Sequence, residues 1–325
     1  MGWSEAPVLV RVPATSANLG PGFDALGLAL SLYDDVAARV TRSGLSIEVS
    51  GEGAADVADA GEKHLVVRAM RAAFDDLGVG QPPGISVHCV NRIPHGRGLG
   101  SSAAAIVAGV LAARALVGAG VSADEALPLA NELEGHPDNV APCLYGGLTI
   151  AWLSDGQPVA DGAADATPVP RSGTPHAIRL EPAEHVTPVA IIAPAPVSTE
   201  VARGLLPGQV PHSDAARNAG RAALLVAALT ARPEALLDAT EDRLHQDYRA
   251  PAMPATHDLV GRLRGAGLAA VVSGAGPSVL ALLTSARELE TLDSIVRETG
   301  IEWRVSPLDV ERQGASVAPG VPSSW

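Results

Sequence analysis

Lysine is almost absent from this chain of 325 residues, in which Lys63 is the single example. A Walker-type P-loop needs a lysine directly before a serine or threonine at the end of its glycine-rich turn. Lys63 lies far upstream of the glycine-rich segment described below. The sequence therefore excludes a Walker-type P-loop.

Cysteines and aromatic residues are also few. The two cysteines, Cys89 and Cys143, lie far apart and form no C-x-x-C pair, so neither a disulfide framework nor a zinc site is indicated. We expect both thiols to be reduced. Aromatic residues make up only 3% of the chain, so the core must consist of alanine, valine and leucine.

Basic charge and long apolar runs are lacking as well. The formal net charge of −13 argues against nucleic acid or an anionic membrane as the main partner, because both require basic patches. A nucleotide is still allowed, since backbone N–H groups and Mg²⁺ can bind its phosphates. No charged-then-apolar signal precedes Val8, and no apolar run free of Gly, Pro or charge reaches about 18 residues. We expect a soluble, cytoplasmic protein.

The length predicts about two domains. Strands and helices alternate in both halves, which predicts an α+β architecture. We place the domains at residues 1–165 and 166–312, and we expect the patternless tail, residues 313–325, to be disordered. Residues 154–177 contain Gly, Pro, Ala, Asp and Thr without periodicity, so we expect a long exposed loop near the domain boundary.

The most informative segment is residues 94–104, in which a glycine-rich loop leads directly into an alanine-rich helix. Glycines at alternate positions permit positive φ and let backbone N–H groups converge on an anion. Ile106, Val110 and Ala113 then follow at helical spacing, so the loop lies at a helix N-terminus, where phosphate groups bind favourably. The predicted phosphate site consists of Pro94, His95, Gly96, Arg97, Gly98, Leu99, Gly100, Ser101, Ser102, Ala103 and Ala104.

This segment has two other possible interpretations. A dinucleotide-binding loop requires an acidic residue about 20 positions later, where this chain has Gly118 and Gly120. A simple glycine turn that caps a buried helix is the second alternative. Ser101 and Ser102 favour phosphate, because two hydroxyls in the first turn exceed what a cap requires.

Polar side chains also gather in two other segments. Residues 14–24 carry Asn18 and Asp24 among turn formers, which indicates either an Asx turn or a loop that binds a small polar ligand. Glu132 and Glu134 precede the polar run at residues 135–142. This region is either a solvated helix end or the source of a carboxylate that completes an Mg²⁺ shell with phosphate oxygens and a serine hydroxyl.

Residues 14–24, 94–104 and 273–278 together resemble the motifs of the GHMP kinases, and the resemblance covers about residues 8–308. Within that superfamily, residues 13–24 are similar to the N-terminal signature of the homoserine kinase family. Residues 136–142, residues 197–199 with Arg203, and residues 248–251 also match this family. The superfamily loop alone would not select a substrate, whereas these four motifs do.

The resemblance implies a two-domain GHMP kinase fold. The N-terminal, ATP-binding domain would contain a left-handed β-α-β crossover, and the C-terminal domain would be ferredoxin-like. Residues 94–104 would hold the ATP phosphates, with Ser102 and Glu132 as Mg²⁺ ligands and Glu134 as the second choice of carboxylate. His64 and Leu65 lie in the region that contacts the base in relatives. A homodimer is expected from the resemblance alone.

The implied activity is ATP-dependent phosphorylation of the L-homoserine hydroxyl in threonine biosynthesis. The implied substrate site consists of Asn18, Asp24, His136, Asn139, Arg203 and Arg249. Asp24 would bind the ammonium group, and the two arginines would bind the carboxylate. Asn139 matches a position at which several GHMP kinases have an aspartate base, so we expect no dedicated base.

Asn18, Asn139 and Arg203 would instead orient the substrate and the transition state. Two alternatives remain open at this point. One is a related kinase that acts on mevalonate or a branched sugar alcohol, and the other is a catalytically silent nucleotide sensor.

Overall fold

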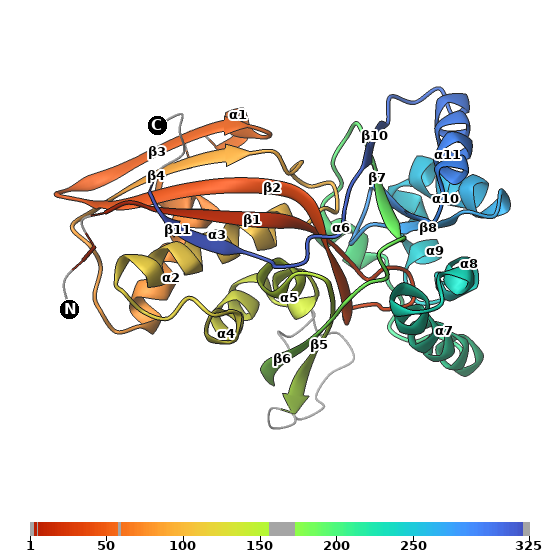
Figure 1. The fold of residues 1–325 in the computed structure, drawn as a ribbon, viewed down its shortest axis with the longest axis horizontal. Coiled ribbons are helices and arrows are strands. Elements are labelled where there is room, and N and C mark those ends of the chain that lie inside the picture. Colours follow the sequence, from red (N-terminus) through yellow and green to blue (C-terminus); the bar gives the residue numbers. More distant parts are fainter. Residues whose placement is uncertain (1–2, 5, 58–59, 156–172, 321–325) are drawn as a thin grey trace.

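The computed structural model describes residues 3–4, 6–57, 60–155 and 173–320. Within these residues the strands form one sheet of seven strands and another of four, and helices pack against each (Figure 1). No helix in this part of the chain is long and apolar enough to cross a lipid bilayer.

The first sheet has the order β11-β1-β2-β4-β3, and β5 joins β2 to β6. The long strand β2 pairs with β5 through its first residues and with β4 through its last ones. Only the β3–β4 pair is parallel. These strands are β1 (Val8–Ala17), β2 (Leu26–Thr41), β3 (Gly44–Gly51), β4 (Gly84–Asn91), β5 (Leu148–Asp155), β6 (Gly173–Leu180) and β11 (Ser316–Pro319).

Helices α2 (Leu65–Asp76), α3 (Ser101–Leu116), α4 (Ala123–Glu134) and α5 (Pro137–Tyr145) lie on one side of this sheet (Figure 1). The short helix α1 (Ala54–Val57) lies next to β3 at the edge of the sheet, and η1 (Gly61–Lys63) leads into α2. Helix α2 connects the parallel strands β3 and β4, as in the predicted crossover, whose left-handed sense stays a prediction. Helix α3 is buried on nearly every side, so it is a central helix rather than one with a single apolar stripe.

Small residues make this central position possible. A Cβ atom on Gly109 would lie 2.5 Å from the carbonyl oxygen of Val66, so α2 and α3 approach closely there. Helix α4 begins with a capping box between Ser122 and Glu125, and Pro128 lies inside the helix. Because α3 is central, the glycine-rich loop that precedes it lies at the junction of the two sheets.

The second sheet is antiparallel and has the order β10-β7-β9-β8. Its strands are β7 (Thr187–Ile192), β8 (Ala269–Val272), β9 (Val279–Leu283) and β10 (Arg304–Pro307). Its helices are α6 (Thr199–Gly204), α7 (His212–Thr230), η2 (Pro233–Ala235), α8 (Leu236–Ala239), α9 (Gln246–Arg249), η3 (Ala250–Ala252), α10 (Pro254–Gly265) and α11 (Ala286–Glu298). Helices separate β7 from β8 and β9 from β10, which confirms the predicted ferredoxin-like β-α-β-β-α-β order.

The structure also corrects several predictions. The tail is not disordered throughout, because β11 pairs with β1, and residues 321–325 lie outside the described residues. Strand β6 extends the first sheet although it falls in the range 166–312, and most of the expected loop at 154–177 lies outside the described residues. Residues 14–17 of the segment expected to be a turn or loop continue strand β1, through an irregularity in its register after Pro13, and residues 137–145 form the unpredicted helix α5.

Candidate active site

The glycine-rich loop has the backbone conformation that a phosphate cradle requires. Gly96, Gly98 and Gly100 all have positive φ, at 64°, 72° and 71°. A Cβ atom on Gly98 would lie 2.1 Å from the Ser273 carbonyl oxygen, and one on Gly100 would lie 2.0 Å from Thr15 Oγ1. Gly100 is the N-cap of α3 and has no side chain to bind the first-turn N–H groups, which are therefore available to a ligand.

The second glycine turn, residues 273–278, packs directly on this loop. Ser273 Oγ donates a hydrogen bond of 2.7 Å to the Gly98 carbonyl, and Asn18 Nδ2 donates one of 2.8 Å to the Gly274 carbonyl. The three motifs that carried the resemblance therefore meet at one place. The Arg97 guanidinium donates to the carbonyls of Ala193 and Pro194 at 2.9 Å, so this side chain links the domains.

A cavity of about 140 Å³ lies where these motifs meet. The loop glycines, Ser101 and Ser102 line one side of it. The other lining residues include five of the six predicted substrate residues, namely Asn18, His136, Asn139, Arg203 and Arg249.

The sixth predicted substrate residue, Asp24, pairs with Arg203 at the edge of this cavity. Arg203 Nη2 lies 2.8 Å from Asp24 Oδ1, and Nη1 lies 3.4 Å from Oδ2. The Asp24 side chain is 10% exposed and that of Arg203 is 33% exposed. Asn18 Oδ1 accepts a hydrogen bond from the Asp24 N–H, and both residues have positive φ, a strained conformation typical of functional positions.

Arg249 is a buried cation that faces the cavity. It is 1% exposed, its Nε has no hydrogen-bond partner, and its guanidinium forms no ion pair with a carboxylate in the described part of the chain. Burial and the nearby charge of Arg203 lower its pKa to about 10, which leaves it positively charged at neutral pH. Such a group favours an anion in the cavity.

His136, Asp138 and Asn139 lie at the start of α5. Asp138 Oδ1 lies 2.5 Å from His136 Nδ1 and 3.5 Å from Asn139 Nδ2. Burial alone would lower the pKa of His136, but the hydrogen bond to Asp138 and the charges of Asp138 and Glu134 raise it above its usual value. The imidazole is therefore biased towards its charged form, and the Asp138 carboxylate is held by its neighbours.

The carboxylate nearest Ser102 belongs to Glu134. Ser102 Oγ donates a hydrogen bond of 2.7 Å to Glu134 Oε2, and burial raises the pKa of the Glu134 carboxyl. Glu132 lies two residues earlier on α4, about 200° around the helix, and is exposed. The geometry therefore favours Glu134 over the first-choice Glu132.

These oxygen donors fit Mg²⁺, which prefers hard oxygen ligands and few of them from protein. Within the described residues, no group of three or more His, Cys, Asp or Glu side chains could hold a metal ion. An ion at Ser102 and Glu134 would therefore depend on oxygens from a nucleotide.

A second cavity, of about 220 Å³, lies beside the same first turn of α3. Ser101 and Ser102 line both cavities, and His64 and Leu65 line this one. His64 Nδ1 is buried without a hydrogen-bond partner, and burial followed by the charge of His95 lowers the pKa of His64. The neutral form of the His64 imidazole is therefore favoured, and its Nδ1 can form a hydrogen bond in the region expected to contact a nucleobase.

Comparison with known proteins agrees with this geometry. The family model for the GHMP kinases N terminal domain matches residues 64–147, and that for GHMP kinases C terminal matches residues 223–302. The homoserine kinases of Streptomyces coelicolor and Streptomyces avermitilis are each 56% identical to this chain over 317 residues, which is 97% of this chain and 95% and 96% of theirs. This chain belongs to the homoserine kinase family of the GHMP kinases.

Solved structures extend the similarity to the whole fold of the family. The homoserine kinase from Cytophaga hutchinsonii has a TM-score of 0.77 at 28% identity, and covers 98% of this chain and 99% of its own. Mevalonate kinase from L. major, at 15% identity and a TM-score of 0.66, covers 94% of this chain and 96% of its own. It shares the fold alone.

Sequence reasoning missed two residues that the structure places at the site. Thr15 Oγ1 donates a hydrogen bond of 2.9 Å to Asn139 Oδ1, next to Gly100. His245 is completely buried against Arg249. Thr15 lies inside the motif at residues 14–24, and His245 precedes Arg249 by about one helical turn, but neither pattern indicates a contact.

Proposed function

We propose that this protein transfers the γ-phosphoryl group of ATP to the hydroxyl of L-homoserine, producing ADP and O-phospho-L-homoserine for threonine biosynthesis. One observation carries the proposal: a glycine-rich loop at a helix N-terminus shares a cavity with two arginines, one of which pairs with a carboxylate. The first part suits a triphosphate, and the second suits an amino acid. We also propose a cytoplasmic location, which is compatible with the use of ATP in biosynthesis, and a homodimer stays a prediction.

The nucleotide would bind across both cavities. Its phosphates would lie at the first turn of α3, and its base would lie in the cavity lined by His64 and Leu65. Ser102 and Glu134 would hold Mg²⁺, which when bound neutralises charge on the phosphate oxygens. The N–H groups of the loop would stabilise the same oxygens without reorganisation.

The substrate is a zwitterion, and the site offers a charge for each of its ends. The Asp24 carboxylate suits the ammonium group, and Arg203 and Arg249 suit the carboxylate. Because Asp24 and Arg203 pair with each other in this structure, homoserine would replace one internal ion pair by two with the substrate. A ligand with a single charge would break the Asp24–Arg203 pair and replace it at only one of the two side chains, which disfavours such ligands.

The described residues offer no obvious base for the hydroxyl. Asn139 cannot accept a proton under ordinary conditions, and the Asp138 carboxylate is held by His136 and Asn139. Phosphoryl transfer through a loose transition state requires mainly alignment and charge neutralisation. We therefore propose catalysis without a dedicated base, in which Asn18, Asn139 and Arg203 orient the reacting groups.

The test is ADP release coupled to a spectroscopic readout, with homoserine and a panel of other alcohols. Two members of the panel isolate the charges: 4-hydroxybutyrate lacks the ammonium group, and 3-aminopropan-1-ol lacks the carboxylate. We expect homoserine to have the highest kcat/KM. A higher value for mevalonate or a sugar alcohol would instead indicate a related kinase, and no ADP with any alcohol would indicate a nucleotide sensor.

A further inference from the structure

His245 lies outside the predicted site, yet it contacts the most deeply buried cation in the cavity. Its side chain is 0% exposed. The imidazole lies between two polar groups: Nε2 is 2.8 Å from the Gly20 carbonyl oxygen, and Nδ1 is 3.0 Å from Arg249 Nη1. Every one of these contacts is internal to the protein.

The two partners determine the tautomer of this imidazole. A carbonyl oxygen can only accept a hydrogen bond, so Nε2 carries the proton. A guanidinium can only donate, so Nδ1 presents its lone pair to Arg249. His245 is therefore the Nε2–H tautomer. Asp242 Oδ1 lies 3.8 Å from the same Nε2 and acts to raise the pKa of His245, but complete burial outweighs it and lowers the pKa, which favours the neutral form.

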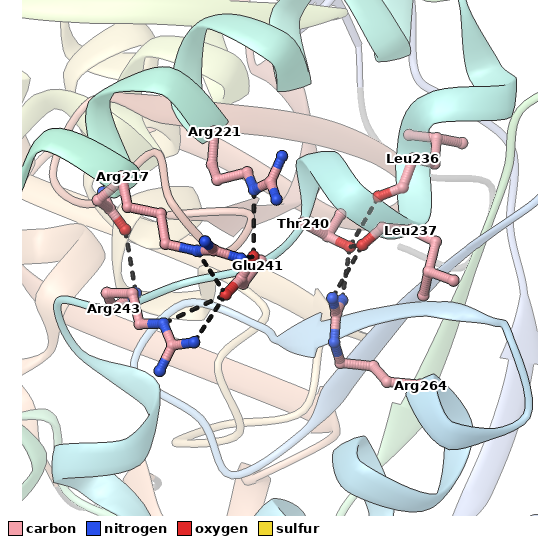
Figure 2. Close-up of polar contacts among 9 residues, drawn as sticks. Arg217, Arg221, Leu236, Leu237, Thr240, Glu241, Arg243 and Arg264 are labelled. Atoms are coloured by element: carbon pink, nitrogen blue, oxygen red, sulfur yellow. Dashed lines mark hydrogen bonds and ion pairs between the residues drawn. The ribbon is translucent and has the colours of Figure 1, made fainter. Parts of the chain in front are cut away.

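The main chain around His245 is held by other groups. The Asp242 carboxylate accepts hydrogen bonds from the N–H groups of Leu244, His245 and Gln246 at 2.8 to 3.0 Å. The preceding residue, Glu241, is bound by the guanidinium groups of Arg217, Arg221 and Arg243 (Figure 2). The position of the imidazole is thus set by its backbone, and the imidazole in turn restrains Arg249.

His245 also connects Arg249 to the segment that carries Asp24. Gly20 belongs to that segment, and the Phe23 ring stacks on the imidazole at a centroid distance of 5.2 Å. The same ring lies 5.4 Å from the Arg249 guanidinium carbon. A change at His245 would therefore affect the direction of the cation that faces the cavity.

We propose that His245 is a positioning residue for the substrate carboxylate. Its Nδ1 lone pair and the Gly274 carbonyl oxygen, 3.0 and 3.2 Å away, together hold Nη1 of Arg249, so that the rest of the guanidinium is directed towards the cavity. This inference rests on the proposed function, since it assumes that Arg249 binds the carboxylate of homoserine.

The experiment compares His245→Leu, which removes both hydrogen bonds, with His245→Asn, which keeps an acceptor near the position of Nδ1. Thr240→Val is the matched control: Thr240 is also completely buried and hydrogen-bonded in the same segment, but its hydroxyl bonds to Leu236, Leu237 and Arg264 (Figure 2). Each variant is assayed with homoserine, with ATP and with 3-aminopropan-1-ol, and its Tm is measured.

We expect His245→Leu to raise the KM for homoserine roughly 10- to 100-fold, because a buried donor of Arg249 loses its acceptor. The KM for ATP, and kcat/KM for 3-aminopropan-1-ol, should change by less than about threefold, because neither ligand presents a carboxylate to Arg249. His245→Asn should recover most of the loss. Thr240→Val should lower Tm and leave the KM for homoserine unchanged.

Three results would overturn the inference. Equal losses with homoserine and 3-aminopropan-1-ol would indicate general damage to the fold. Identical kinetics for His245→Asn and His245→Leu would show that the acceptor at Nδ1 is irrelevant, and an unchanged KM in both variants would show that His245 does not act on Arg249. Failure of the proposed function is a separate result, because the unmodified protein would then not phosphorylate homoserine at all.

Discussion

Replacing Asp24 by asparagine tests the substrate site most directly. Asparagine keeps the shape of the side chain and removes its charge. The Asp24 side chain is 10% exposed and Arg203 is 33% exposed, so the pair is only partly screened by water. Loss of a hydrogen bond to a charged group costs about 1.5–3 kcal/mol, which corresponds to roughly 10- to 150-fold in kcat/KM for homoserine.

The same substitution should leave nucleotide binding nearly intact. Asp24 lies at the edge of the proposed homoserine cavity, beside Arg203, and does not line the cavity that contains His64 and Leu65, so the KM for ATP should change by less than about threefold. In Asp24→Asn, Arg203 loses its ion pair with residue 24. The guanidinium can then bind an anionic ligand without first breaking that ion pair. The preference for homoserine over 4-hydroxybutyrate should therefore fall by at least the factor lost with homoserine.

The assay is steady-state ADP release with each substrate varied at saturating concentrations of the other. Asp24→Asn and the unmodified protein are compared in homoserine, 4-hydroxybutyrate and ATP. Unfolding in denaturant supplies the control, and a loss near 1 kcal/mol is expected because Arg203 is partly exposed. An effect limited to the KM for ATP, or an unchanged preference for homoserine, would refute the assignment of Asp24 to the ammonium group.

Three further predictions concern the loop, the metal and pH. Glu134→Gln should raise the Mg²⁺ concentration required for half-maximal activity at least about tenfold, whereas Glu132→Gln should match the unmodified protein in the same titration. Gly100→Ala should raise the KM for ATP or prevent folding, because its Cβ would lie 2.0 Å from a neighbouring oxygen, whereas Gly118→Ala, with similar φ but open space around it, should retain the KM for ATP. Hydrogen bonds from arginines, that of Arg217 foremost, lower the pKa of Glu241 to about 2. Glu241→Gln should therefore reduce the unfolding free energy by about 1 kcal/mol at pH 7, and this difference should disappear as pH falls from 4.5 towards 2.

Local sequence patterns determined the backbone conformation of the glycine-rich loop and the positions of several helices. The alternate glycines at residues 96–100 require positive φ whatever surrounds them, and the helix that follows is indicated by its own spacing. The capping box at Ser122 and Glu125 likewise depends on residues within one turn. Motif order along the chain was sufficient to indicate the family, and with it the fold.

Contacts between distant residues were decided only by the tertiary structure. Glu132 and Glu134 are the same residue type on the same helix, so the sequence does not distinguish them as metal ligands. Only the packing of α4 beside α3 places Glu134 next to Ser102. The pairing of Asp24 with Arg203 joins residues 179 positions apart. Strand β11 forms because the edge of β1 is available to pair with it. His245 can position Arg249 only because the fold brings Gly20 and Arg249 to its two ring nitrogens. Sequence spacing specifies which way a side chain points on its own helix or strand, whereas its partner is determined by how the elements pack.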